Sequence, residues 1–347
     1  MSDYIILYFV FICLATVGVF FIDKKQPIFF YFVIGIILIL IAGFRGEGVD
    51  RDYENYSLLY KGFDTLTLLL TEPTFVFISW LIKSSNDNVV GLFIIYAFLG
   101  VTLKFFAIRL LSYQSTLSVL IYFSTFFLLH EMTQIRAGVA SGIFLLSIQP
   151  LFDRKLAYFF ALAVLAILFH YSSFIILPLY FLSPSNIKVK LWGAAILAVY
   201  FLHFCNIHFT SLLEFLPLQN VQYKLEANKE VMAINEDKIN VFNILQIMRL
   251  IFCFLFLSFI DLIQKANKYS ILLLKIYILS VCSMVAFADV PTFSVRISEF
   301  FGVVELIIIP FLVYIVLPKR AGAIAVVIVA LILITTNLFY TKLLSFV

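Results

Sequence analysis

Long apolar runs separated by short polar segments make up most of this chain. The runs are about 17 to 22 residues long, which is enough for an α-helix to cross ~30 Å of hydrocarbon. Apolar residues predominate along each run, which is typical of helices that face lipid or the interior of a bundle. The expected membrane helices are 4–22, 28–44, 89–109, 114–130, 135–151, 190–206, 243–262, 270–288, 300–317 and 322–341.

Two further apolar stretches leave the topology open. The stretch 72–85 is too short for a straight crossing. The stretch 156–182 is longer than the other apolar runs and has His170 in its middle. In one topology, 72–85 lies on the membrane surface, and 156–182 enters from the cytoplasmic side and returns as two arms of about 20 Å each. In the other, each stretch crosses once, which turns Arg109 outward. Because short basic loops stay in the cytoplasm, the charge pattern favours the first topology.

Composition agrees with a membrane protein. The chain is 63% hydrophobic and 13% charged, with a mean hydropathy of +1.09, values that exclude an ordinary soluble domain. We therefore expect an all-α, polytopic integral membrane protein with about 12 membrane helices, including a re-entrant or broken pair. Residues 1–347 would form a single transmembrane domain, with outward loops at 45–88 and 206–242.

Several classes of function have no support in the sequence. It contains no phosphate-binding glycine loop and no HExxH motif, and nothing favours nucleic-acid binding. The four cysteines lie in or beside apolar runs and are not spaced as metal ligands. We therefore expect them to be small, buried apolar side chains. Neither a metal nor a cofactor is expected.

A charged, tyrosine-rich segment, RGEGVDRDYENYSLLYKGFD, interrupts the apolar pattern at residues 45–64. It carries three basic residues, five carboxylates and four tyrosines or phenylalanines. Tyr53, Tyr56 and Tyr60 are spaced to share one face of a short surface helix, where their rings and hydroxyls suit sugars. The segment indicates a polar, charged substrate at the membrane surface.

Ionisable residues within or beside apolar runs are costly, so each needs an explanation. Each has an ordinary interpretation, as a snorkelling arginine, a loop carboxylate, a packing residue or a buried histidine. In the favoured topology, however, all of them point to the outer half of the membrane. Several arginines near a carboxylate suit a pyrophosphate, and a carboxylate or histidine can accept a proton from a sugar hydroxyl. These residues are Arg45 with Asp50 and Asp52, Arg136, His170, Arg249, and Arg296 with Glu299.

Four motifs occur in an order that resembles the EpsG-type branch of the Wzy polysaccharide polymerases. They are RGEGVDRDYENY, in which Asp52 begins DYxNY, then IRAGVASGIFLLS, FHYSSFIILPLYF and VRISEFF. The resemblance covers most of the chain. It implies a fold like that of GT-C membrane glycosyltransferases, with surface-lying helices, in a bacterial inner membrane and with the active site facing the periplasm. It also implies a metal-independent enzyme that uses undecaprenyl-diphosphate-linked oligosaccharides as donor and acceptor, with a chain-length regulator as a further partner.

On this interpretation the protein polymerises lipid-linked repeat units into O-antigen or exopolysaccharide. The expected base is Asp52, then His170, with Asp50 a third catalytic candidate. Arg136 and Arg296, then Arg45, would neutralise the leaving diphosphate, and the remaining substrate-binding candidates are Arg249, Glu299, Tyr53, Tyr56 and Tyr171. Two alternatives stay open. A flippase for lipid-linked glycan would carry charged residues along a path on both sides, and a membrane acyltransferase would need a cytoplasmic donor site.

Overall fold

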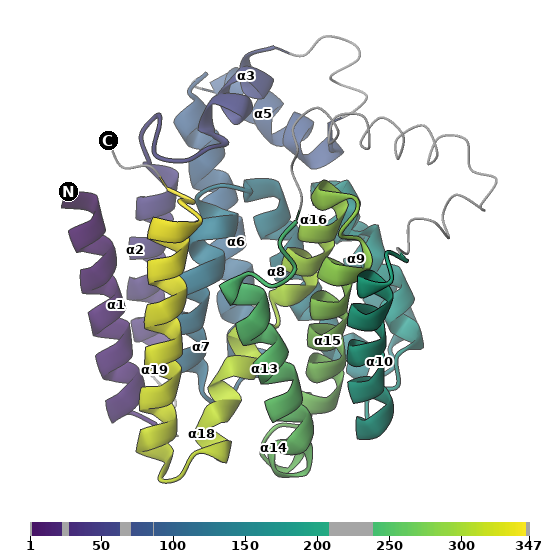
Figure 1. Cartoon of the computed structure of the whole chain (residues 1–347). Helices are drawn as coiled ribbons and strands as arrows, with labels where there is room; N and C mark the ends of the chain where they lie inside the picture. Colours follow the sequence, from purple (N-terminus) through teal and green to yellow (C-terminus); the bar gives the residue numbers. More distant parts are fainter. Residues whose placement is uncertain (1, 23–27, 63–70, 86, 208–238, 345–347) are drawn as a thin grey trace. The chain divides into compact units, whose positions relative to one another are not determined.

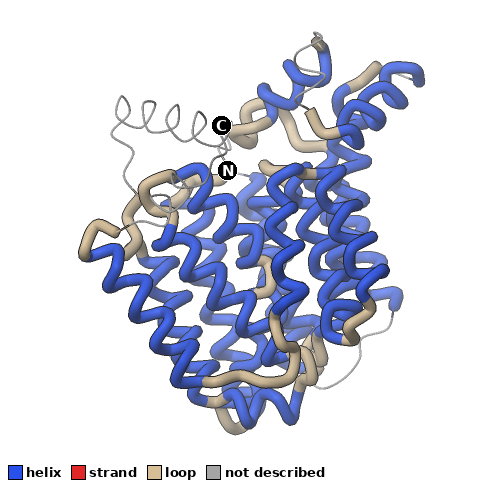
Figure 2. The backbone as a smooth tube through the Cα atoms, turned by 90° about the vertical axis from the view of Figure 1, so that its right-hand side faces the viewer, coloured by secondary structure: helices blue, strands red, loops and turns tan. Residues whose placement is uncertain are grey.

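The protein is built of helices joined by short loops (Figures 1 and 2). The computed structural model describes residues 2–22, 28–62, 71–85, 87–207 and 239–344. Within these ranges no strand forms, and a single antiparallel bridge joins Asp50 to Leu344. The expected all-α architecture is confirmed for the described ranges. Most of the expected outward loop 206–242 lies outside them.

Four of the described helices are long and apolar enough to cross a membrane, or five if one bent helix pair counts as one span. Seven shorter apolar helices of 10–17 residues also lie in the described ranges. The protein is therefore membrane-embedded, while the expected count of about 12 crossings stays a prediction. The long spans are Val89–Leu111, Ile135–Phe152, Pro291–Ile315 and Lys319–Tyr340.

The chain divides into two compact units, so a single transmembrane domain over residues 1–347 stays a prediction. The first unit combines Met1–Phe181 with Glu305–Val347, and the second is Leu182–Val304. The helices of the first unit are α1 (Ser2–Phe20), α2 (Ile28–Gly43), α3 (Tyr53–Lys61), α5 (Pro73–Ser85), α6 (Val89–Leu111), α7 (Ser115–Tyr122), the π-helix η1 (Phe123–Glu131), α8 (Ile135–Phe152), α9 (Leu156–Phe169), the 3-10 helix η2 (Tyr171–Phe181), α17 (Glu305–Ile308), η3 (Ile309–Phe311), α18 (Leu312–Ile315), α19 (Lys319–Thr335) and η4 (Thr336–Tyr340).

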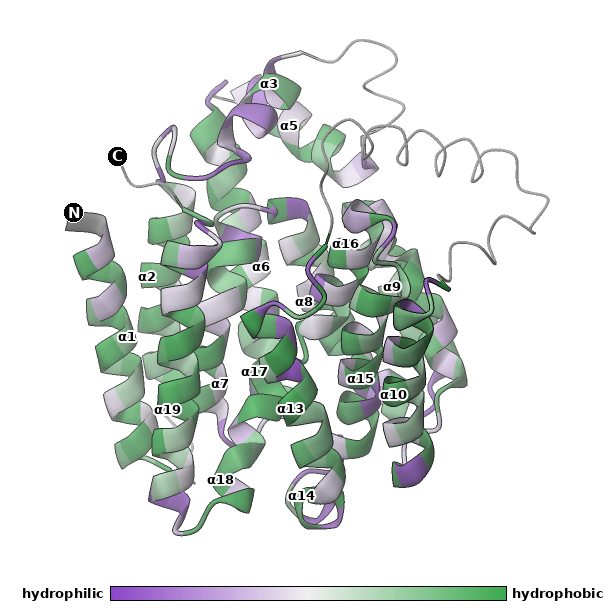
Figure 3. Ribbon diagram, viewed as in Figure 1, coloured by the Kyte–Doolittle hydropathy of each residue, from purple (hydrophilic) through white to green (hydrophobic). Residues whose placement is uncertain are grey.

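Within the first unit, α1, α2, α6, α7, α8 and α19 run side by side, and α3 and α5 lie at one end of them (Figure 1). The long helices are hydrophobic along their length, whereas hydrophilic residues gather on the segment before α3 (Figure 3). Apolar side chains such as Ile5, Phe9 and Phe29 are more than 60% exposed, as expected for surfaces that lipid covers. The end that carries α3 and α5 is therefore the polar end of this unit, and it positions the candidate site.

Residues 156–182 fold back on themselves as a hairpin. The helix α9 ends at Phe169, His170 takes an extended conformation, and η2 returns beside α9. The Tyr180 ring lies 5.7 Å from that of Phe159 and 5.6 Å from that of Phe160, so the two ends of the hairpin meet. The fold-back is confirmed, and His170 lies at its tip. Its depth in a bilayer stays a prediction.

The second unit corrects two expected elements. The stretch 243–262 is not one straight helix, because the chain bends by 80° between α13 and α14. In α14, Ile260 and Ile263 are buried. The polar residues Asp261 and Lys265 therefore lie on a helix that no longer continues the axis of α13. Residues 289–299, which fall between the expected helices 270–288 and 300–317, are not all loop, since Pro291 starts a helix that contains Arg296. The helices are α10 (Val189–Phe204), α13 (Ile244–Ser258), α14 (Ile260–Ala266), α15 (Ser270–Ala286) and α16 (Pro291–Gly302).

Candidate functional site

Arg45 and Asp50 form a buried ion pair at the polar end of the first unit. Arg45 follows the last turn of α2, and its Nε donates to Asp50 Oδ2 at 2.6 Å. Both side chains are almost fully buried. Arg45 Nη1 also donates to the Ala42 carbonyl at 2.7 Å, and the guanidinium lies 4.0 Å over the Phe93 ring. This arginine therefore holds the start of the outer segment against α6.

A second cluster joins three elements through one carboxylate, that of Glu72. Glu72 lies directly before α5, and its Oε2 accepts a hydrogen bond from Nη1 of Arg136, near the start of α8. Its other oxygen, Oε1, lies 3.2 Å from His170 Nδ1 at the tip of the hairpin. The Tyr171 backbone N–H points to the same oxygen at 3.4 Å. Glu72 thus brings together two of the residues expected from the sequence, Arg136 and His170.

Access differs sharply among the three members of this cluster. The Glu72 side chain is 5% exposed, whereas those of Arg136 and His170 are 26% and 17% exposed. The Arg136 Nε is buried and has no hydrogen-bond partner among the described residues. The carboxylate is therefore an internal organiser, while the guanidinium and the imidazole keep surface that a substrate can reach.

Aromatic rings connect the two clusters. The Arg136 guanidinium lies 5.5 Å from the Tyr56 ring centroid and 5.6 Å from that of Phe75. Tyr56 in turn contacts Phe93 edge to face at 6.5 Å, and Phe93 is the ring beneath Arg45. Cations over aromatic faces gain about 0.5–2 kcal/mol each, depending on desolvation. Both arginines therefore rest on one continuous aromatic layer.

The two carboxylates of these clusters have pKa values shifted in opposite directions. Burial would raise the pKa of Glu72, but the hydrogen bond with His170 and the charge of Arg136 outweigh it and lower the pKa below 4.5. For Asp50, burial is the larger effect and raises its pKa above 3.8 despite the charge of Arg45. Glu72 is accordingly the carboxylate that its surroundings hold charged.

The other residues expected from the first outer loop are arranged around these pairs. Asp52 precedes α3, and its partly exposed side chain makes no capping hydrogen bond. The short helix expected there is confirmed, and Tyr53 packs on Phe93 at 4.8 Å. Tyr56 is 6% exposed, so its ring is covered in this conformation. Tyr171 is 43% exposed, and its hydroxyl donates to the Thr71 carbonyl at 3.3 Å. Sugar contacts by these tyrosines stay predictions.

Three expected site residues belong to the second unit. Arg249 in α13 donates from Nη1 to Ser298 Oγ at 3.4 Å. A Cβ atom at Gly302 would lie 3.4 Å from Arg249 Nη2, an ordinary van der Waals contact, so the guanidinium packs beside this glycine. Arg296 is exposed and Glu299 is half-buried on α16. A pocket shared by Arg296 and Arg136 stays a prediction.

The chain also contains a buried charged group that sequence reasoning missed. Lys104 in α6 and Glu131 at the end of η1 are both fully buried, with Nζ and Oε1 2.6 Å apart. Lys104 donates to the Gly138 carbonyl at 2.6 Å as well, and the Tyr122 hydroxyl donates to Glu131 Oε1 at 3.1 Å. A Cβ atom at Gly100 would lie 2.0 Å from Glu131 Oε2, so the absent side chain leaves space for the carboxylate.

The sequence held a signal for one of the residues that were missed, Lys104, but none for Glu72. Lys104 is the charged residue in the middle of the apolar run 89–109, and a buried ammonium requires a carboxylate on a neighbouring helix. Glu72 stands directly before the short apolar stretch and looks like an ordinary loop residue. No pattern in one sequence shows that it meets residues 136 and 170. Pairing across such separations is decided by packing.

The lowered pKa of Glu72 predicts how stability responds to acid. A lowered folded-state pKa contributes stability that is present above pH 4.5 and is lost as the pH falls through the folded value. We expect the unfolding temperature of the wild type in detergent to fall more than that of Glu72→Gln between about pH 7 and about pH 4. Asp50 is present in both proteins, so the effect of its raised pKa on stability cancels when the two unfolding temperatures are compared. Equal decreases would show that Glu72 is not held charged by its neighbours.

Comparison with known proteins places the chain in a family. No group of three or more histidines, cysteines and carboxylates in the described ranges is arranged to hold a metal ion. No curated protein and no solved structure matches the chain. The model of the EpsG family matches residues 28–346, nearly the whole sequence. With its apolar helices, this match identifies a membrane protein of polysaccharide biosynthesis. The chain therefore belongs to the EpsG family.

Proposed function

We propose that the protein is a polysaccharide polymerase that joins lipid-linked oligosaccharide repeat units. The donor would be a growing glycan on undecaprenyl diphosphate, and the acceptor a new lipid-linked repeat unit. The site would face the periplasm of a bacterial inner membrane, the side to which the charge pattern assigns the outer loops. The observation that carries the proposal is the contact of Glu72 with both Arg136 and His170, which joins a phosphate-binding group to a proton acceptor.

The proposed reaction is a displacement at the anomeric carbon of the donor. The hydroxyl at the nonreducing end of the acceptor forms a bond to that carbon, and the bond from the carbon to the diphosphate oxygen breaks. The lipid diphosphate leaves with the electron pair, and the hydroxyl proton passes to the base. Charge grows on the departing oxygens, so a fixed guanidinium lowers the barrier by binding that charge more tightly in the transition state. Arg136 is the proposed donor because its side chain is partly exposed.

We assign the base to His170 rather than to Asp52. A carboxylate that holds one imidazole nitrogen fixes the tautomer and leaves the other nitrogen free to accept a proton. Glu72 stands in that relation to His170 Nδ1, at 3.2 Å. Asp52, which the motif favoured, has a partly exposed side chain that makes no capping hydrogen bond to orient it. A third expected candidate, Asp50, is buried and paired with Arg45.

The test is chain extension by the purified protein in liposomes that contain lipid-linked repeat units. Wild type should produce a ladder of longer glycans, and His170→Ala should lower the rate by about 10²–10⁴, the usual contribution of a general base. Asp52→Asn should lower it by less than tenfold, because it removes charge near the site but no proton acceptor. Product length is read by electrophoresis.

A matched control is His203→Ala, which removes a histidine of α10 in the second unit and should extend chains at the wild-type rate. A large loss in Asp52→Asn with normal extension by His170→Ala would move the base to Asp52. Transport of the lipid-linked units across the bilayer with no extension would contradict the polymerase proposal and support a flippase. Transfer of acyl groups to the glycan would support an acyltransferase instead.

A further inference from the structure

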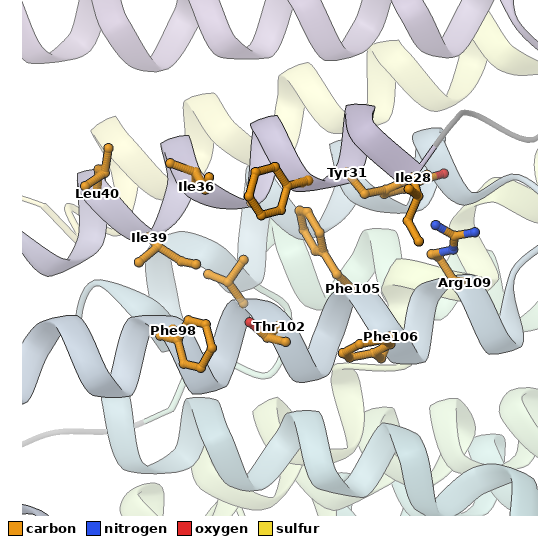
Figure 4. Close-up of a pocket in the computed structure, with 13 residues that line it drawn as sticks. Ile28, Tyr31, Ile36, Ile39, Leu40, Phe98, Thr102, Phe105, Phe106 and Arg109 are labelled. Carbon is orange, nitrogen blue, oxygen red and sulfur yellow. The ribbon is translucent and has the colours of Figure 1, made fainter.

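An apolar groove of about 680 Å³ runs between α2 and α6 of the first unit (Figure 4). Its walls are almost wholly hydrocarbon, and several of their side chains are uncovered by protein. Phe98 is 54% exposed, Phe106 63% and Ile36 41%. A hollow of this kind on an apolar helix surface leaves contacts unmade unless a chain of matching polarity fills it.

One end of the groove carries a cation and the other end does not. Arg109 lies beside Tyr31 and Ile28 at the first end, with its guanidinium carbon 5.1 Å from the Tyr31 ring centroid (Figure 4). The Tyr31 hydroxyl and Ser115 Oγ are 2.5 Å apart, which fixes that ring. No described carboxylate forms an ion pair with Arg109, which is exposed. Leu40 and Phe98 form the opposite, apolar end.

The length of the groove matches one leaflet of a bilayer. From Phe98 to Arg109 the helix α6 rises about 17 Å, at ~1.5 Å per residue. Half of the hydrocarbon core of a bilayer is about 15 Å thick. A single acyl chain of a glycerophospholipid therefore fits with its phosphate at Arg109, whereas a long polyprenyl chain exceeds the groove several times over.

We propose that this groove binds one acyl chain of an anionic glycerophospholipid, whose phosphate pairs with Arg109. The guanidinium, which forms no ion pair with a described carboxylate, favours a lipid with net negative charge over a zwitterionic lipid with the same chains. Tyr31 and Ile28 border the phosphate end, and the apolar walls hold the chain. The site is separate from the Glu72 cluster and is independent of the proposed polymerase activity.

The test measures lipid binding to the purified, delipidated protein by native mass spectrometry. The probes are phosphatidylglycerol and phosphatidylcholine with identical acyl chains. Arg109→Gln removes the charge and keeps the groove. Thr102→Phe places a ring in the groove at a half-buried position, and Ile36→Phe does so from the facing helix if the first variant is unstable. Arg320→Gln, which removes an exposed arginine at the start of α19, is the matched control.

Wild type and Arg320→Gln should bind phosphatidylglycerol about fivefold more tightly than phosphatidylcholine, the ratio that corresponds to ~1 kcal/mol for one cation near a lipid headgroup. Arg109→Gln should lose this preference while it still binds a chain. The groove-filling variants should lose the tightly bound lipid altogether. The proposal is overturned if Arg109→Gln keeps the wild-type preference, if the filled groove still retains the lipid, or if the delipidated protein prefers polyprenyl phosphate over phosphatidylglycerol.

Discussion

Replacing Arg136 with alanine is expected to lower glycan extension by about a hundredfold or more, the effect typical of losing one fixed transition-state donor. The guanidinium is held by Glu72 and by the rings of Tyr56 and Phe75, so its position requires no reorganisation during the reaction. Lipid diphosphate carries more charge on its oxygens as it leaves than when bound. The loss should therefore fall mainly on kcat rather than on KM.

The Arg136→Lys variant separates charge from geometry. Lysine keeps one positive charge but cannot reproduce the planar fork that contacts Glu72 and a phosphate together. We expect its activity to lie between that of wild type and that of Arg136→Ala. The exposed Arg320 is the control position, and the Arg320→Ala variant should extend glycans at the wild-type rate.

The main alternative explanation for lost activity in Arg136→Ala is a loss of fold stability. Removal of Arg136 leaves Glu72 buried and without its arginine partner, which destabilises the fold by itself. The double variant Arg136→Ala with Glu72→Ala removes both charges and should regain the unfolding temperature without regaining activity. If the double variant extends glycans at the wild-type rate, Arg136 has no role in the reaction.

Breaking the Lys104–Glu131 pair is expected to produce the largest loss of stability. Each single variant, Lys104→Met or Glu131→Gln, removes one partner of a fully buried ion pair, a change that usually costs about 3–5 kcal/mol of unfolding free energy. The remaining group also keeps too few partners, because without Glu131 the Lys104 ammonium retains one hydrogen bond to a described residue, that to the Gly138 carbonyl. The loss is measured by unfolding in mixed detergent micelles.

The double variant Lys104→Met with Glu131→Gln should recover most of that loss, because neither remaining side chain is a buried charge. An exposed ion pair between a lysine and an aspartate supplies the control. Lys155 lies 3.8 Å from Asp153, with side chains 66% and 28% exposed, and Lys155→Met should change stability by less than about 1 kcal/mol. Additive losses in the double variant would show that the two buried groups do not depend on each other.

Much of the fold could be predicted because hydrocarbon imposes simple rules on a chain. Apolar runs of membrane length became helices with bounds close to those expected, as in α2, α6 and α8. The fold-back at His170 was predicted from the pattern of basic loops, and the length of residues 156–182 agreed with it, since they are too few for two full crossings. The bend after α13 was missed because the average hydropathy of 243–262 hides the polar turn at its end.

The candidate site could be predicted only in part. Arg45, Asp50, Arg136 and His170 stood out because charge in an apolar context is conspicuous. Their partners could not be assigned from one sequence. Asp50 pairs with Arg45 rather than standing free, and Arg136 and His170 meet at Glu72, a residue that seemed ordinary.

The sequence by itself determined that this is an all-helical membrane protein with a polar segment at residues 45–64, because hydropathy and helix length depend on local composition. Four short motifs also indicated the EpsG family, which the match over residues 28–346 then established. Only the tertiary structure decided which charges are paired: Arg45 with Asp50, Lys104 with Glu131, and Arg136 with Glu72. The physical reason is that a buried charge needs a partner within a few ångströms, and helix packing chooses that partner across separations in sequence that local patterns do not encode.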